Sequence, residues 1–206
     1  NCTGCELCVE DCPYQAVMMR PRTDGMPYPL EAVVIPKRCA SCGICVGSCD
    51  YKAINLPDIT EDEVKKEIKR LSQELATGTG GGKVFVFACA KGAWLNNTDG
   101  DGKLKGRDWA RVVKLPCIGM LQPSMLSIPF EAGVDGVYIS SCRQGDCDYR
   151  RGNEWLAGRL AGYRPPVVKR AIDRSKVRVG YLSAVEPSGA LRELEDFRDG
   201  LKQRGG

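Results

Sequence analysis

Eight of the twelve cysteines lie in two copies of one motif, within about the first quarter of the chain. The first copy reads CTGCELCVEDCPYQAV from Cys2 to Val17, and the second reads CASCGICVGSCDYKAI from Cys39 to Ile54. Both space their cysteines C-x2-C-x2-C-x3-C, and the second copy starts 37 positions after the first. Three thiolates at i, i+3 and i+6 can curl around a metal–sulfur cube and turn backbone N–H groups toward its sulfides. The repeat therefore indicates two metal–sulfur centres of the same construction.

The fourth cysteine of such a run ligates the other cluster in two-cluster ferredoxins. The expected ligands of two [4Fe–4S] clusters are therefore Cys2, Cys5, Cys8 and Cys49 for cluster I, and Cys39, Cys42, Cys45 and Cys12 for cluster II. Structural zinc is the alternative, because it also uses sites of four cysteines. Zinc ribbons usually bring two C-x2-C pairs rather than two runs of four cysteines, so the spacing favours the iron–sulfur clusters.

This segment resembles bacterial-type two-cluster ferredoxins, which implies an α+β ferredoxin-like domain over residues 1–56. One departure is that Asp50 follows Cys49, where the family usually has proline. The other is the 26 residues between Cys12 and Cys39, which are more than a minimal ferredoxin has. The prolines and glycine of residues 21–29 predict a turn or hairpin extension before the strand-like residues 32–35.

Composition limits the classes of protein to consider. The 206 residues suffice for one compact domain plus a small one. A net charge of +4, without a basic tract interleaved with aromatic residues, does not favour a nucleic-acid partner. No signal peptide and no apolar run of membrane-spanning length is present. The absence of histidine excludes Rieske ligation, His-ligated haem and histidine acid–base chemistry within this chain.

The start of the chain is unusual for this fold. It begins at Asn1 rather than methionine, and an expected cluster ligand stands at position 2. The strand that ordinarily precedes the first motif of a ferredoxin is missing. We therefore expect the chain to be a piece of a longer polypeptide, or to lack its N-terminal part. The clustered C-x2-C pairs predict metal binding in a reducing cytoplasm rather than a secreted disulfide scaffold.

Residues 57–82 predict a helix followed by a linker. Thr60 and Glu63 have the spacing of a capping box. Four apolar residues follow at helical spacing, namely Val64, Ile68, Leu71 and Leu75. We expect this stripe to cover the ferredoxin unit or the next domain, with a partner helix as the alternative. Residues 78–82 form a glycine-rich run, which is typical of a flexible linker.

Residues 83–206 alternate short apolar strands with helices. The expected strands are Val84–Ala88, Val112–Leu115, Gly136–Ser140 and Val177–Leu182. The helix candidates lie near Met120–Ala132, Glu154–Ala161, Val167–Ser175 and Ser188–Gln203. Buried strands that alternate with helices predict an α/β domain with a mainly parallel sheet.

The remaining four cysteines follow the first three of these strands. They are Cys89, Cys117, Cys142 and Cys147. Because chemistry gathers at the carboxyl ends of parallel strands, we expect them to converge at one edge of the sheet. Four thiolates suffice for one [2Fe–2S] cluster. The alternatives are inert buried cysteines, a redox-active pair of Cys142 and Cys147, and zinc.

A second resemblance rests on the stretch from Val137 to Asn153. It carries the pattern C-x-x-G-D-C-x-Y-x-x-G-N and resembles the delta subunit of methyl-viologen-reducing hydrogenase. In that family the pattern marks an electron-transfer domain that binds [2Fe–2S]. The segments that end at Cys89 and Cys117 resemble its earlier cysteine segments, so the similarity spans about residues 83–203. The family typically has a C-x2-C pair after the first strand, and here Gly92 stands at the later position.

The fusion of these two units resembles the C-terminal part of proteins related to the A subunit of heterodisulfide reductase. These include the B subunit of the quinone-interacting membrane-bound oxidoreductase, and the larger members add an FAD domain upstream. This chain has no dinucleotide-binding fingerprint, so FAD is expected only in a missing upstream part or in a partner. The resemblance implies flavoprotein, hydrogenase-like or heterodisulfide reductase-like partner subunits, with a quinone-reactive membrane subunit among them. The chain itself is expected in the cytoplasm, at the membrane only through partners.

The sequence thus predicts a module that relays single electrons between partner subunits of an anaerobic redox complex. No general acid, general base or substrate pocket is evident, so catalysis is expected to belong to the whole complex. The alternative is a ferredoxin unit joined to a metal-free α/β scaffold that docks neighbours. A thiol–disulfide oxidoreductase that uses Cys142 and Cys147 is disfavoured, because these residues lack C-x-x-C spacing.

Overall fold

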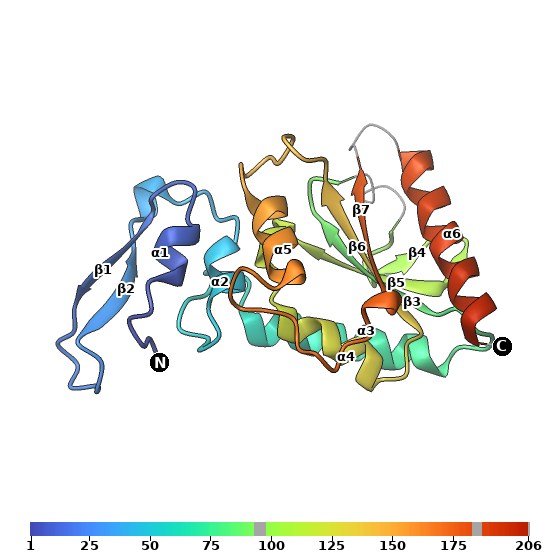
Figure 1. Ribbon diagram of the computed structural model, residues 1–206, viewed down its shortest axis with the longest axis horizontal. Coiled ribbons are helices and arrows are strands. Elements are labelled where there is room, and N and C mark those ends of the chain that lie inside the picture. Colours follow the sequence, from blue (N-terminus) through green and yellow to red (C-terminus); the bar gives the residue numbers. More distant parts are fainter. Residues whose placement is uncertain (93–97, 183–186, 206) are drawn as a thin grey trace.

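The computed structural model describes residues 1–92, 98–182 and 187–205. A small unit built from the N-terminal residues lies beside a larger α/β unit (Figure 1). Helix α5 (Gly152–Ala161) lies between the N-terminal unit and the sheet, and a two-stranded hairpin lies at the end of the molecule farthest from the sheet (Figure 1).

The N-terminal unit is built on its repeat. Each motif copy contains one short helix, α1 (Leu7–Asp11) in the first and α2 (Ile44–Ser48) in the second. Between them, β1 (Val17–Pro21) pairs antiparallel with β2 (Leu30–Val34), and a 3-10 turn (Pro36–Arg38) leads into the second copy. The predicted hairpin extension is therefore confirmed.

Helix α3 (Glu61–Thr77) begins at the expected capping box. The Thr60 hydroxyl accepts from the Glu63 N–H, and the Glu63 carboxylate accepts from the Thr60 N–H. The four apolar residues of the predicted stripe are all buried. They pack in the same core as β5 and the residues around α4, so the stripe covers the α/β unit.

The larger unit contains a five-stranded sheet of order β4-β5-β3-β6-β7. Its strands are β3 (Val84–Cys89), β4 (Lys103–Leu104), β5 (Arg107–Leu115), β6 (Gly136–Cys142) and β7 (Val177–Leu182). All neighbours run parallel except β4, which pairs antiparallel with β5. The prediction of a mainly parallel sheet is therefore confirmed. Strand β5 begins five residues before the predicted Val112, because Arg107 pairs with β4 and pairing with β3 starts at Ala110.

Two of the predicted helices differ in the structure. The candidate near Met120–Ala132 is broken into 3-10 turns (Ile118–Met120 and Pro123–Leu126) and the short α4 (Ser127–Glu131). Pro123 and Pro129 each lack an N–H for a continuous helix. The helix predicted over Val167–Ser175 is wrong, since only the 3-10 turn Arg174–Lys176 forms there. This segment instead runs over the sheet unit and buries Val168 and Ile172 in its core.

Helices cover both faces of the sheet. One face packs Phe85, Phe87 and Ile139 against the core that includes α3 and α5. The opposite face packs Tyr138 against Phe197 of α6 (Pro187–Gly205). This three-layer arrangement leaves the carboxyl ends of the parallel strands beside α5, where the N-terminal unit docks (Figure 1).

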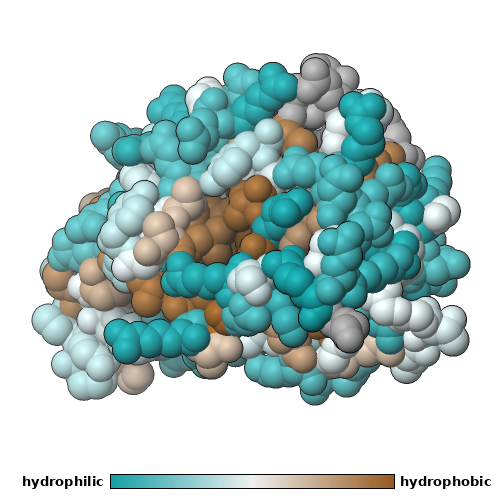
Figure 2. Space-filling model, turned by 45° about the vertical axis from the view of Figure 1, so that its right-hand side comes forward, coloured by the Kyte–Doolittle hydropathy of each residue, from teal (hydrophilic) through white to brown (hydrophobic). Residues whose placement is uncertain are grey.

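The surface of the molecule is mostly hydrophilic, with apolar residues gathered in a hollow that hydrophilic residues frame (Figure 2). One apolar groove of about 170 Å³ is lined by Leu126, Leu160, Val168, Ile172, Arg174, Val177 and Val179. Within the described parts of the chain, no helix is both long and apolar enough to cross a membrane.

Candidate metal centres

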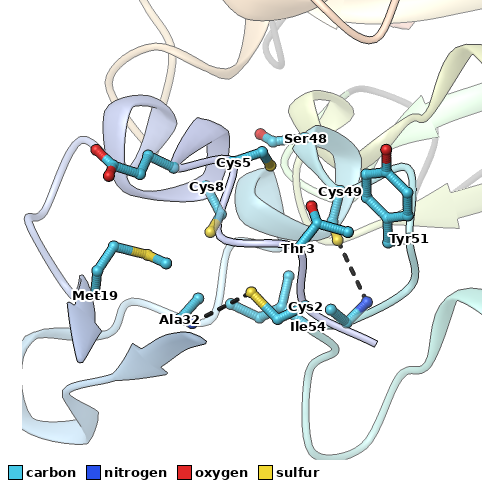
Figure 3. Close-up of a pocket in the computed structure, with 12 residues that line it drawn as sticks. Cys2, Thr3, Cys5, Cys8, Met19, Ala32, Ser48, Cys49, Tyr51 and Ile54 are labelled. Atoms are coloured by element: carbon cyan, nitrogen blue, oxygen red, sulfur yellow. Dashed lines mark hydrogen bonds between the residues drawn. The ribbon is translucent and has the colours of Figure 1, made fainter. Parts of the chain in front are cut away.

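The first centre is a pocket formed by both motif copies. Cys2, Cys5 and Cys8 of the first copy and Cys49 of the second line it together, as the sequence predicted for cluster I (Figure 3). The Gly4 and Ala32 N–H groups donate to Cys2 Sγ at N···S distances of 3.5 and 3.4 Å.

The Ala53 N–H donates to Cys49 Sγ at 3.3 Å, and Met19 and Ile54 supply apolar lining (Figure 3). Four thiols, N–H groups directed at two of the sulfurs, and an apolar wall are the features that hold an iron–sulfur cube. The residues present therefore fit such a group.

The second centre has the same construction. Cys39, Cys42 and Cys45 of the second copy and Cys12 of the first line a separate pocket, as predicted for cluster II. The Ala16 N–H donates to Cys12 Sγ at 3.2 Å, and the Ser41 N–H donates to Cys39 Sγ at 3.4 Å. Each bond has its counterpart 37 positions away in the other copy. The same local backbone therefore forms both pockets.

Left-handed backbone explains how short segments wrap around these pockets. It occurs at three equivalent places in the two copies, which are Gly4 and Ser41, Glu6 and Gly43, and Gln15 and Lys52. Four of these six residues are not glycine, and left-handed backbone is costly for residues with a side chain. Such strain persists only where contacts with the surrounding structure hold the backbone in that conformation. Here the left-handed conformation turns N–H groups toward the cysteines.

The two pockets adjoin each other. Cys8 and Cys45, one from each, pack in one small cluster with Val17 and Ile54. Burial raises the pKa of both the Cys8 and the Cys45 thiols to about 12, and neighbouring cysteines add to the rise through like charge. Two thiols this unfavourable to ionise would become thiolates only with a bound cation, because a coordinated thiol is deprotonated outright.

The four other cysteines converge at the carboxyl ends of β3, β5 and β6. Cys89 Sγ lies 3.7 Å from Cys142 Sγ. A Cβ added to Gly152 would lie 2.1 Å from Cys117 Sγ and 3.6 Å from Cys147 Sγ, so both sulfurs lie over the first residue of α5. The Gly119 N–H donates to Cys117 Sγ at 3.4 Å. The predicted convergence of four distant cysteines is therefore present.

These four thiols interact in a row, from Cys89 through Cys142 and Cys147 to Cys117. Hydrogen bonds from its thiol neighbours lower the pKa of Cys147, and a hydrogen bond from Cys142 lowers that of Cys89 to about 7. The same contacts raise the pKa of Cys142 and Cys117. These hydrogen bonds therefore make two of the thiols easier to ionise and two harder, and a cation is needed to bring all four to the thiolate state. Among the described residues, no group of three or more His, Cys, Asp or Glu side chains has the geometry to hold a single metal ion.

The Gly-Asn pair that ends the sequence signature has a structural role at this site. Gly152 leaves the space that the Cys117 sulfur occupies, since a Cβ there would lie 2.1 Å from it. The Asn153 side chain donates to the carbonyl oxygens of Cys142 and Arg143 at 3.3 and 2.7 Å. Asn153 thereby fixes the loop that carries two of the four cysteines.

The second cysteine pocket and the four-cysteine site adjoin across the junction of the two units. Cys42, Ile44 and Cys117 are buried in one small cluster, against which Tyr14, Cys147, Tyr149 and Trp155 pack. The Arg150 guanidinium lies 4.8 Å from the centre of the Tyr14 ring and donates to the Pro13 carbonyl at 3.0 Å. The three cysteine sites therefore follow one another through the molecule.

Sequence reasoning missed the polar contacts that hold the junction. Asp11 and Arg159 are both buried and form an ion pair at 2.7 Å, although 148 positions separate them. Gly47 and Gly119 permit the close approach, since a Cβ on Gly47 would lie 2.3 Å from the Gly119 oxygen. The one available signal was that Asp11 and Ser48 occupy the same place in the two motif copies.

Comparison with known proteins finds relatives that match about half of the chain or somewhat more. The chain is 28% identical over 127 residues to the iron-sulfur D subunit of the vhc F420-non-reducing hydrogenase of Methanococcus voltae, covering 60% of this chain and 86% of that one. It is 26% identical over 95 residues to the iron-sulfur D subunit of the F420-non-reducing hydrogenase of Archaeoglobus profundus, covering 46% and 69%. The A subunit of the ferredoxin:CoB-CoM heterodisulfide reductase of Methanosarcina mazei is 24% identical over 95 residues, covering 46% of this chain and 12% of that one.

Family models agree with these relatives. Residues 1–74 match the 4Fe-4S dicluster domain. Residues 84–205 match the methyl-viologen-reducing hydrogenase delta subunit, which accounts for more than half of the chain. The chain therefore belongs to the methyl-viologen-reducing hydrogenase delta-subunit family, with a 4Fe-4S dicluster domain ahead of the family's own domain.

Proposed function

We propose that this iron–sulfur electron-transfer protein relays single electrons along three adjoining centres. Two are [4Fe–4S] clusters, held by Cys2, Cys5, Cys8 and Cys49 and by Cys39, Cys42, Cys45 and Cys12. The third is a [2Fe–2S] cluster held by Cys89, Cys117, Cys142 and Cys147. The observation that carries the proposal is their order, because Cys8 adjoins Cys45 and Cys42 adjoins Cys117.

The clusters supply the redox chemistry by taking up and releasing one electron each. The chain's own residues bind the clusters, exclude water from them and determine how strongly the negative charge of the added electron is stabilised. Ile54 and Leu56 close the two ferredoxin pockets with apolar side chains, and backbone N–H groups offset negative charge on Cys2, Cys12, Cys39 and Cys49.

The positions of the four sulfurs support a [2Fe–2S] cluster at the third site. Two thiols per iron are what a [2Fe–2S] cluster requires, and Cys89 with Cys142 and Cys117 with Cys147 form two such close pairs. The cysteine that the family typically has at position 92 is not needed for this set. The Gly92 N–H instead donates to the Cys89 carbonyl at 2.9 Å and closes the turn after β3.

Electrons would enter or leave where ligands reach the surface. Cys5 and Cys39 are exposed, while Cys8, Cys42 and Cys117 are buried. Relatives of this chain are named as hydrogenase and heterodisulfide reductase subunits. We therefore propose hydrogenase-like, heterodisulfide reductase-like or flavin-bearing neighbours, in which any FAD would reside, and a cytoplasmic place of action. Catalysis would belong to that complex.

The test is freeze-quench EPR after anaerobic protein is mixed with less than one equivalent of reduced methyl viologen. The proposal predicts [4Fe–4S] and [2Fe–2S] signals that redistribute among the centres until the ratio is constant. Cys5→Ser should remove only the cluster I signal and Cys147→Ser only the [2Fe–2S] signal, so each variant is the control for the other.

Signals that stay where they first appear, without redistribution, would contradict the relay. An unchanged spectrum in Cys147→Ser would favour a metal-free docking scaffold in the α/β unit instead.

A further inference from the structure

One charged side chain from the α/β unit reaches the ferredoxin clusters' ligand segments. Arg159 of α5 has 0% of its side chain exposed. Its Nη2 donates to Asp11 Oδ2 at 2.7 Å and to Ser48 Oγ at 2.8 Å, and its Nη1 donates to the Gly119 carbonyl at 2.7 Å. A guanidinium is rarely buried so completely, because its charge must be compensated where water is excluded.

The positions of its partners connect Arg159 to both clusters. Asp11 stands immediately before Cys12, and Ser48 stands immediately before Cys49. Cys12 belongs to the first motif copy but lines the pocket of cluster II, and Cys49 belongs to the second copy but lines the pocket of cluster I. Ser48 also lines the pocket of cluster I and donates to Asp11 Oδ2 at 2.5 Å. One guanidinium therefore touches the segment before a ligand of each cluster.

The charges in this group do not balance. Arg164 also binds the Asp11 carboxylate, through Oδ1, and stacks on Trp155 with 3.5 Å between its guanidinium and the ring centre. Two guanidiniums therefore share one carboxylate. The group of Arg159, Arg164 and Asp11 has an excess of one positive charge at a largely buried place. Every electron that a cluster accepts makes it more negative, so a fixed positive charge nearby stabilises the reduced form.

We propose that Arg159 sets the reduction potentials of both ferredoxin clusters, so that the α/β unit raises the potentials of the unit that it docks. Arg159 is a positioning and charge-supplying residue and not a ligand. The inference rests on the proposed [4Fe–4S] ligands. A unit charge in a partly buried environment shifts a one-electron equilibrium by roughly tenfold, which corresponds to about 59 mV.

The test is an anaerobic potentiometric titration followed by EPR, on the whole chain, with iron counted for every variant. Arg159→Met removes one positive charge and should lower both [4Fe–4S] potentials by about that amount. Asp11→Asn removes the carboxylate, increases the positive excess and should raise them. Arg159→Lys keeps the charge and should stay near the wild type.

Arg198→Met is the matched control, because Arg198 stacks on Trp109 on the opposite side of the sheet, 4.3 Å from the ring centre. Loosened packing alone would shift the potentials of Arg159→Met and Asp11→Asn in the same direction, which would overturn the inference. Unshifted potentials with full iron content would overturn it too. If Arg159→Met does not fold, the rise in Asp11→Asn remains a sufficient test. Wild-type protein without cubes would instead refute the proposed function, and this inference with it.

Discussion

Gly152→Ala should abolish the proposed [2Fe–2S] cluster of the α/β unit and leave the two proposed [4Fe–4S] clusters intact. The added methyl would lie 2.1 Å from Cys117 Sγ, where ordinary contact begins at 3.4 Å. The sulfur or the helix must therefore shift by about 1.3 Å. Metal–ligand distances are maintained within about 0.2 Å, so a shift of this size is not compatible with ligation.

The neighbours of Gly152 cannot easily relieve this clash. Asn153 ties the helix start to the carbonyls of Cys142 and Arg143, and the Gly119 backbone nitrogen would lie only 3.3 Å from the added methyl. Rotation of Cys117 is the easier response, and that takes one of the four ligands out of the site. Iron per chain should therefore fall from about ten to about eight, with loss of the [2Fe–2S] EPR signal only.

The assay is iron and acid-labile sulfide per chain on anaerobically purified protein, together with EPR of the reduced sample. Gly189→Ala is the matched control, since a Cβ there has nothing within 4 Å. If Gly152→Ala retains about ten irons and a normal [2Fe–2S] signal, the four cysteines do not bind a cluster in this arrangement, and the reasoning is refuted.

Three further predictions concern stability and docking. Ile68→Ala removes a side chain of α3 that is 0% exposed and should lower the free energy of unfolding by about 2–5 kcal/mol. The measurement is an anaerobic denaturant titration, with Lys69→Ala at an exposed position as the control; equal midpoints would contradict the prediction. Thr60→Ala removes the capping-box hydroxyl and should cost about 1 kcal/mol in the same titration; an unchanged midpoint would show that the cap contributes nothing. Gly47→Ala places a methyl 2.3 Å from the Gly119 oxygen and should loosen the docking of the two units. This would be seen as faster proteolysis at residues 55–60, which connect the N-terminal unit to α3, than in Gly81→Ala, where the added methyl has nothing within 4 Å; equal rates would contradict this.

Local patterns made much of the cysteine chemistry predictable. The spacing of each motif copy indicates which thiols can face one pocket. The crossing of Cys12 and Cys49 is expected because the fourth cysteine of such a run ligates the other cluster in two-cluster ferredoxins. The strands before Cys89 and Cys142 are continuous apolar runs, so their parallel arrangement and the shared edge could be inferred. The ligand roles themselves remain predictions that the iron measurements test.

Contacts between distant segments were not predictable from the same signals. Arg159 has the sequence context of an ordinary surface residue on a helix, and only the fold brings it to Asp11 and Ser48. The segment around Val168 and Ile172 has helical spacing of apolar residues, but burial in the core without a helix satisfies the same pattern. The early start of β5 depended on pairing with β4, a two-residue strand too short to detect.

The most direct test of the three proposed centres, on which the relay depends, is the iron and sulfide content of wild-type protein prepared without oxygen, with EPR during stepwise reduction. Two cubes and one [2Fe–2S] cluster predict about ten irons per chain and three distinct reduced signals. About eight irons without a [2Fe–2S] signal would contradict the third centre, and Cys89, Cys117, Cys142 and Cys147 would then be structural thiols of a docking domain.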